Sequence, residues 1–102
     1  MRRPAIIKRI SLTVKKELPD ISVWLYGSEA RGDARPDSDI DLLMLIDTNK
    51  ITMEDRERLT TPLYDIELDT GIQINPVIYT SSDWEKHNGP FYHNVMQERI
   101  RL

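Results

Sequence analysis

Two short motifs in this chain combine residue types that suit phosphoryl chemistry. Gly27-Ser28 forms a turn able to hold a phosphate, and Asp39 and Asp41 follow as two carboxylates spaced two residues apart. Glycine lets the backbone approach an anion closely, the serine hydroxyl can donate to it, and the amides that open a following helix add further donors. Paired carboxylates favour a divalent cation, which relieves their mutual repulsion. Phosphate and metal together are the working parts of phosphoryl or nucleotidyl transfer.

The two aspartates are predicted to lie on one face of a strand. Side chains alternate between faces along a strand, so Asp39 and Asp41 point the same way, while Ile40 and Leu42 point into the core. Mg²⁺ suits this pair because it binds one or two carboxylates together with substrate phosphates. Two such ions about 3.5–4 Å apart activate the attacking oxygen and steady the leaving phosphate. The pattern therefore favours a Mg²⁺ site, with two ions expected.

Arg31 lies one helical turn beyond the Gly-Ser pair and has two candidate roles. Its guanidinium could reach the same phosphate, or it could pair with Asp33 or Asp37. A P-loop of the Walker type is excluded, because no Gly-Lys-Ser or Gly-Lys-Thr follows.

Three strands are predicted from β-branched, aromatic and apolar runs. They cover residues 21–26, 40–46 and 72–79. The second run is almost wholly apolar, which is typical of a central strand covered on both faces. Pro76 cannot donate to a strand ladder, so the third strand is expected at a sheet edge or to carry a bulge.

Helices are predicted before, between and after these strands from apolar spacing and capping residues. They cover residues 6–18, 29–32 and 54–69, a short stretch capped by Ser82, and residues 91–100. The expected N-caps of the second and third helices are Ser28 and Thr52, and Pro62 is expected to kink or restart the third helix. The prediction is an α/β (α+β) fold with a three-stranded mixed sheet and helices mainly on one face, in a single domain spanning 1–102.

Composition limits the classes of function. The formal net charge of −3 argues against general nucleic-acid binding, which normally uses a basic face. The absence of cysteine excludes disulfides and thiolate metal sites. No run approaches the roughly 18 apolar residues of a membrane span. A cytoplasmic protein without membrane contact is the default expectation.

The motif region resembles the minimal nucleotidyltransferases of the DNA polymerase beta-like superfamily. That family's pattern is Gly-Ser-x-x-Arg-Gly, five residues, then Ser-Asp-x-Asp-Leu, and residues 27–42 match it without a gap. The resemblance implies that Asp39 and Asp41 are the catalytic metal ligands and that Gly27 and Ser28 hold a nucleoside triphosphate. Such domains often lie beside a small helical HEPN protein and act as its antitoxin. Some transfer AMP from ATP to a tyrosine of that partner.

One position departs from the family's pattern. The family usually carries a third carboxylate on the next strand, and the candidate positions here are Gln73 and Asn75. An amide can bind a metal through its oxygen but cannot accept a proton at neutral pH. Possible substitutes nearby are Asp65, Glu67 and Asp69, which lie on a predicted helix and are interpreted as its solvated face.

The sequence leaves three functions open. The first is Mg²⁺-dependent transfer of NMP, chiefly AMP from ATP, to a hydroxyl of a protein partner, as the antitoxin of a HEPN-type toxin. The second is a catalytically weak or inactive module that binds nucleotide and neutralises its partner by contact. The third is a transferase that modifies a tRNA or a small molecule. Each predicts a partner chain or a homo-oligomer, because no second domain is expected to bring the acceptor.

Overall fold

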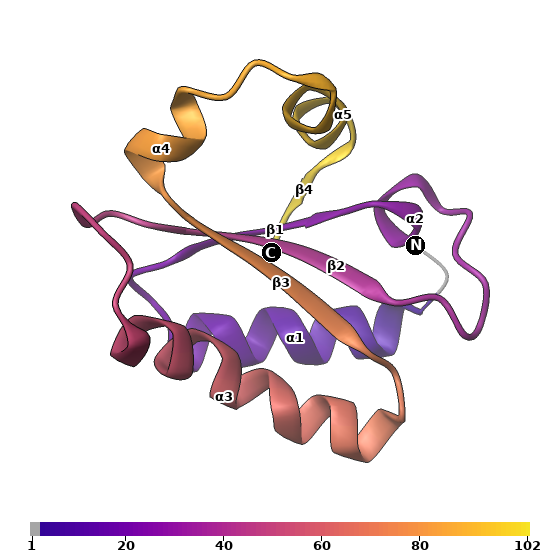
Figure 1. Ribbon diagram of the computed structural model, residues 1–102. Coiled ribbons are helices and arrows are strands. Elements are labelled where there is room, and N and C mark those ends of the chain that lie inside the picture. The colour runs from indigo at the N-terminus through magenta and orange to yellow at the C-terminus, as the bar shows by residue number, and fades with distance from the viewer. Residues whose placement is uncertain (1–2) are drawn as a thin grey trace.

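A four-stranded mixed sheet of order β3-β2-β1-β4 forms the centre of the computed structural model, which describes residues 3–102 (Figure 1). The strands are β1 (Ser22–Tyr26), β2 (Ile40–Ile46), β3 (Ile74–Thr80) and β4 (Ile100–Arg101). β2 pairs antiparallel with β1 and parallel with β3, and β4 pairs antiparallel with the other side of β1. The predicted count of three strands is wrong, since β4 is a fourth, and the last helix ends at Glu98, before the predicted residue 100. Sequence reasoning missed β4 because a strand of two residues is too short to show an alternating pattern.

Helices cover both faces of the sheet (Figure 1). The long helices α1 (Pro4–Glu17) and α3 (Met53–Thr70) contact each other on one face, and α4 (Ser81–Glu85) and α5 (Pro90–Glu98) lie on the other. The short α2 (Ser28–Arg31) follows β1 directly. The predicted fold class is confirmed. The sequence predicts helices mainly on one face, whereas the structure places the two long helices on one face and the shorter α4 and α5 on the other. None of the helices in the described part of the chain is long and apolar enough to cross a membrane.

The main core lies between the sheet and the two long helices. Alternate side chains of β2, Ile40, Leu42 and Met44, are fully buried there. They belong to the same cluster as Ile10 of α1 and Leu63 of α3. Because strand side chains alternate, the residues between them in β2 are directed to the opposite face.

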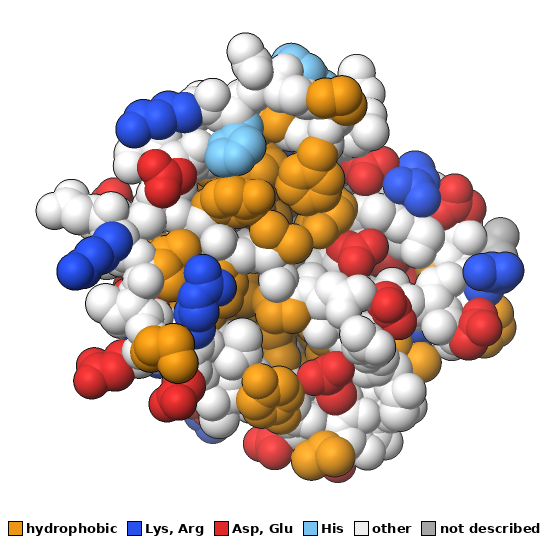
Figure 2. All heavy atoms as spheres, in the orientation of Figure 1, with side chains coloured by type: hydrophobic (Ala, Val, Ile, Leu, Met, Phe, Trp, Pro, Cys, Tyr) orange, Lys and Arg blue, Asp and Glu red, His pale blue; other side chains and the backbone are white. Residues whose placement is uncertain are grey.

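That opposite face carries a smaller apolar cluster beside the aspartate motif. Trp84 of α4 and Val95 of α5 pack there with Tyr26 of β1 and Leu43 of β2. Figure 2 shows hydrophobic side chains gathered between α4, α5 and the sheet, with acidic side chains next to them. Asp41 shares this face with Leu43, so its carboxylate lies at the margin of the smaller cluster and away from the main core.

α3 begins where its capping residues predict and continues through its proline. The Thr52 hydroxyl accepts a hydrogen bond from the Asp55 amide, and the Asp55 carboxylate accepts one from the Thr52 amide, which confirms the predicted cap. The predicted restart at Pro62 is wrong, because this proline lies inside one continuous helix. The Thr61 hydroxyl donates to the Glu57 carbonyl, so it bonds back within the helix and does not cap a new one.

The predicted caps of the two short helices are wrong. Ser28 is the first residue of α2, and the cap position belongs to Gly27. Thr80 caps α4 by accepting a hydrogen bond from the Asp83 amide, so the helix begins before Ser82. At each place the observed cap precedes the expected one, Gly27 before Ser28 and Thr80 before Ser82, so each short helix begins earlier than predicted. The edge position expected from the proline of β3 is confirmed by the strand order.

A buried ion pair holds α2 against the start of α1. Glu29 is 0% exposed and accepts hydrogen bonds from the Arg3 amide at 2.7 Å and from Arg3 Nε at 2.9 Å. Glu29 directly follows Ser28, so this pair fixes the turn that carries the Gly-Ser motif. The sequence did not single out this glutamate, because its partner lies 26 residues away.

Replacing Glu29→Ala is expected to lower the free energy of unfolding by about 3–5 kcal/mol, because removal of one partner leaves the other buried charge uncompensated. Urea denaturation measures the loss. Asp69→Ala is the control, since it breaks an exposed pair with Arg9 and should change stability little. A loss for the Glu29 variant no larger than that of the control would contradict the structural role of the buried pair.

Candidate functional site

A pocket of about 630 Å³ lies where β1 turns into α2 beneath one face of α5. Four of the predicted site residues meet in it, namely Gly27, Ser28, Arg31 and Asp41. The rest of its lining comes from β1 and α5, with Tyr26, Phe91, Asn94, Val95 and Glu98. The Gly-Ser turn and the aspartate motif, which are separate in sequence, therefore form parts of one concave site.

Gly27 lies directly against the Asp41 carboxylate. The antiparallel register pairs Tyr26 with Asp41, so the next residue, Gly27, passes beside that side chain. Gly27 has a φ of +77°, and a Cβ built on it would overlap Asp41 Oδ2. Glycine satisfies both conditions, since it has no Cβ and adopts positive φ without strain. The turn and the carboxylate thus form a single structural unit.

Asn75 of β3 lies beside the two aspartates and contacts them. The parallel register places Asn75 beside Asp41, and its Nδ2 donates to Asp39 Oδ2 at 3.0 Å. Gln73 Nε2 donates to Asn75 Oδ1 at 2.9 Å. Of the two amides expected at the third-carboxylate position, Asn75 therefore contacts the pair, and Gln73 reaches it through Asn75.

The protein environment makes ionisation of two pocket side chains, Asp41 and Tyr26, less favourable. Burial is the main cause that raises the pKa of Asp41; a hydrogen bond from Asn75 opposes it, and the neighbouring charge of Asp39 adds to it. These effects are typical of two carboxylates held close together without a cation. Burial, followed by the charge of Asp41, raises the pKa of Tyr26 to about 12. The Tyr26 hydroxyl therefore stays protonated at neutral pH and serves as a wall of the pocket.

The oxygen ligands gathered here suit Mg²⁺. Asp39 and Asp41 supply carboxylate oxygens beside the amide of Asn75. Across residues 3–102, no three His, Cys, Asp or Glu side chains converge into a complete metal cage. Mg²⁺ fits such a partial set, because it commonly binds one or two carboxylates and fills its other positions with water and substrate phosphates.

Arg31 brings a cation to the same pocket. Its Nε lies 3.3 Å from Oδ2 of Asp33, one of the two partners predicted for it. Its Nη1 lies 3.1 Å from Oε2 of Glu98. Hydrogen bonds to Glu98 and Asp33 raise the pKa of Arg31, so its positive charge is secure. Arg31 therefore forms the predicted pair with Asp33 and also lines the pocket, where its guanidinium could contact a phosphate.

Glu98 is a pocket residue that sequence reasoning missed. Its Oε1 accepts a hydrogen bond from the Gly27 amide at 2.9 Å, and its Oε2 accepts one from Arg31. Glu98 lies 71 residues from Gly27 in the chain, so no local spacing connects them. Helical spacing could have pointed to Glu98, because Phe91, Val95 and Glu98 are spaced four and three residues apart and so fall on one face of the predicted last helix.

The acidic residues of α3 lie away from this pocket. Asp65 and Asp69 are exposed, as the interpretation of a solvated face predicts. That interpretation is wrong for Glu67, whose Oε2 accepts a hydrogen bond from the Ile74 amide at 3.0 Å. Glu67 therefore holds the start of β3, and its carboxylate does not replace the missing third carboxylate of the site.

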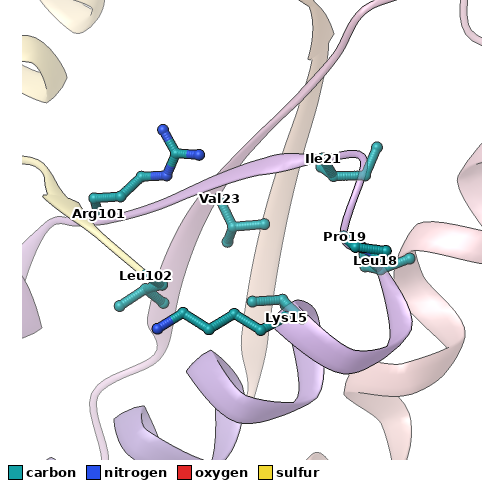
Figure 3. Close-up of a pocket in the computed structure, with 8 residues that line it drawn as sticks. Lys15, Leu18, Pro19, Ile21, Val23, Arg101 and Leu102 are labelled. Carbon is teal, nitrogen blue, oxygen red and sulfur yellow. The ribbon is translucent and has the colours of Figure 1, made fainter.

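A separate hollow of about 420 Å³ lies between the end of α1, β1 and the last two residues (Figure 3). Its polar side chains are those of Lys15 and Arg101, and the remaining lining is apolar: Val14, Leu18, Pro19, Ile21, Val23 and Leu102. No acidic side chain belongs to this lining, so it lacks the ligands for a hard cation. The chemistry is therefore assigned to the pocket at the Gly-Ser turn.

Replacing Gly27→Ala is expected to lower the free energy of unfolding by about 1–3 kcal/mol, through strained positive φ and overlap with Asp41. Gly71→Ala is a matched control, because Gly71 also has positive φ, at +71°, but nothing lies within 4 Å of its added Cβ. Urea denaturation of both variants separates the two causes. Equal losses would show that the contact with Asp41 contributes nothing.

Replacing Asp41→Asn is expected to stabilise the metal-free protein at neutral pH. A raised pKa means that the fold disfavours the ionised form, so this cost is absent when Asp41 is protonated and grows as the pH rises through its pKa. In a chelating buffer the variant should melt at a higher temperature than the wild-type protein at pH 7, with a smaller gain at pH 4. A lower Tm at pH 7, or an equal gain at both pH values, would contradict this.

Comparisons with known proteins give one match over most of the chain and others over part of it. A family model described as a nucleotidyltransferase domain matches residues 7–100. The bifunctional uridylyltransferase/uridylyl-removing enzymes of Pseudomonas savastanoi pv. phaseolicola and Pseudomonas syringae pv. syringae are each 40% identical over 60 residues. That stretch covers 57% of this chain and 7% of each relative, so the chain spans only a small part of those enzymes.

Solved structures with the same arrangement include single nucleotidyltransferases and toxin–antitoxin complexes. A structure described as a minimal nucleotidyltransferase has a TM-score of 0.67 and 26% identity, with 100% of this chain and 97% of that chain covered. A toxin–antitoxin structure with AMP-PNP has a TM-score of 0.62 and 17% identity, over 92% and 69%. The toxin–antitoxin MntA-HpeT structure has a TM-score of 0.59 and 18% identity, over 100% and 72%. At these identities the toxin–antitoxin structures support the fold.

Proposed function

The chain belongs to the nucleotidyltransferase domain family, and from this premise we propose that it transfers a nucleoside monophosphate from a nucleoside triphosphate to a hydroxyl of a protein partner. The sequence resemblance to minimal nucleotidyltransferases is confirmed by the family match and by the structural likeness. The observation that carries the proposal is the contact between Gly27 and Asp41. It brings a turn suited to phosphate and a carboxylate suited to metal into one pocket.

Each predicted site residue has a role in this proposal. Asp39 and Asp41 would hold Mg²⁺, with a two-metal site as the fuller form, and Asn75 orients Asp39 through its hydrogen bond. Bound Mg²⁺ supplies Lewis-acid chemistry, which favours ionisation of the attacking hydroxyl and stabilises negative charge on the leaving pyrophosphate. Gly27 and Ser28 would hold the triphosphate by their amides and hydroxyl, together with the Arg31 guanidinium.

The site lacks a carboxylate at the position from which the family usually removes the proton of the acceptor hydroxyl. Asn75 contacts the aspartate pair at the position where the family usually has a carboxylate, and an amide cannot accept a proton at neutral pH. The proton of the acceptor hydroxyl would therefore pass to water or to a phosphate oxygen of the substrate. A general base contributes roughly 10²–10⁴-fold to such reactions, so we expect slow transfer.

We further propose ATP as the donor nucleotide and a helical toxin of the HEPN type as the acceptor, with this chain as the antitoxin. Two structures that share the fold are toxin–antitoxin complexes, and one of them contains AMP-PNP, which supports an adenine nucleotide and a toxin partner; the HEPN type follows from the sequence resemblance alone. The uridylyltransferase relatives make UTP the natural competitor in a nucleotide screen. We also propose that residues 1–102 form a single domain and that the protein works in the cytoplasm. Its acceptor would be a partner chain or a second copy of this chain.

A second candidate function is favoured by the amide at Asn75. A domain that binds Mg²⁺ and nucleotide but lacks the third carboxylate could neutralise its partner by contact without transferring anything. Turnover, measured separately from nucleotide binding, distinguishes this candidate from the first.

Incubation with α-labelled ATP, Mg²⁺ and the protein encoded by the genomic neighbour is expected to label that protein slowly. The Asp39→Asn, Asp41→Asn double variant should abolish labelling, and Asp69→Asn, which changes an exposed acid of α3, should not. Asn75→Asp restores the third carboxylate and should raise the rate at least about tenfold.

Unchanged labelling by the double variant would contradict the proposed transfer reaction. Mg²⁺-dependent ATP binding without labelling, and with no gain from Asn75→Asp, would instead support neutralisation by contact.

A further inference from the structure

Glu98 occupies hydrogen-bond donors that the proposed function assigns to phosphate. Its Oε1 accepts from the Gly27 amide at 2.9 Å, and its Oε2 accepts from Arg31 Nη1 at 3.1 Å. Carboxylates and phosphates accept charge-assisted hydrogen bonds from the same groups, namely backbone amides and guanidinium groups. The two donors cannot bond fully to both anions at once, so Glu98 and a nucleotide phosphate compete for them.

The backbone around Glu98 is anchored, which keeps its carboxylate at the pocket. Its side chain is 18% exposed, and Val95, one helical turn earlier in α5, is buried in the smaller apolar cluster. On its other side, the Arg99 guanidinium lies 4.1 Å from the Trp24 ring centroid, and β4 pairs with β1. The end of α5 is thus held on both sides of Glu98, while the glutamate's own torsions can still swing the carboxylate aside.

The charges in the pocket oppose an incoming triphosphate while Glu98 stays in place. Asp41 and Glu98 both line the pocket, and Arg31 is the cation of that lining. Mg²⁺ can compensate Asp41, but the Arg31 charge is already paired with Glu98. A triphosphate would therefore meet the Glu98 carboxylate, and no unpaired cation of the lining, at the position of its phosphate contacts.

We propose that Glu98 is an internal anion that occupies the phosphate subsite of the free protein and must leave Gly27 and Arg31 before a triphosphate binds. This rests on the proposed function, because it takes Gly27 and Arg31 as phosphate-binding groups. Glu98 then lowers the nucleotide affinity of the free protein, and nucleotide binding frees the carboxylate at the end of α5. A positioning role predicts the opposite sign, since a glutamate that held these donors ready would strengthen nucleotide binding.

The affinity of Mg²⁺–ATP for the wild-type protein, Glu98→Ala and Glu98→Gln tests this by isothermal titration calorimetry. Glu98→Ala should bind about tenfold more tightly, because it removes both the charge and the acceptor. Glu98→Gln should gain less, because its amide oxygen still accepts from Gly27 but carries no charge. Glu85→Gln is the matched control, since it removes an exposed carboxylate of α4 outside the pocket and should change nothing.

Inorganic tripolyphosphate with Mg²⁺ is the second probe, because it reports the phosphate subsite without a base or sugar. The same order of affinities is expected, and circular dichroism confirms that the variants fold. Wild-type binding with unchanged or weaker affinity in both Glu98 variants would overturn the inference and leave the proposed function standing. A gain with ATP but not with tripolyphosphate would also overturn it. Absence of binding by every protein, Glu98→Ala included, would overturn both claims.

Discussion

The missing side chain of Gly27 allows the end of β1 to lie against the Asp41 carboxylate, and the rest of the site depends on this contact. Two registers bring the other groups to it. The antiparallel pairing of β1 with β2 sets Tyr26 opposite Asp41, and the parallel pairing of β2 with β3 sets Asn75 beside it. The buried Glu29 then fixes the direction of α2 after the turn. A shift of either register by one residue would send these side chains to the other face.

Side chains along β2 alternate between the main core and the face that carries the candidate site. Ile40 and Leu42 enter the main core with α1 and α3, while Asp41 faces the thin layer formed by α4 and α5. The raised pKa of Asp41 shows that this position disfavours a charge that the proposed metal requires. The arrangement is typical of a functional site, where groups needed for chemistry reduce the stability of the free protein.

Local patterns predicted the parts of the fold that depend on neighbouring residues. The strand positions, the Thr52 cap and the grouping of the Gly-Ser turn with Asp41 follow from residue type and local spacing. Gln73 and Asn75 could not be distinguished, because a period of two places both on one face and only the register with β2 selects between them. Glu98 and β4 were missed because they act through pairings with β1 and its turn, far away in the chain.

The central claim is that the Gly27 turn and the aspartate pair form one metal–nucleotide site. Mn²⁺, used in place of Mg²⁺ with ATP present, tests it most directly, because the ion broadens the NMR signals of nearby amides. The account predicts that the amides of Gly27, Asp41 and Asn75 broaden first at low Mn²⁺, and that this selectivity is lost when Asp39 and Asp41 are both replaced by asparagine. Broadening centred elsewhere, or the same pattern in the double variant, would contradict the account.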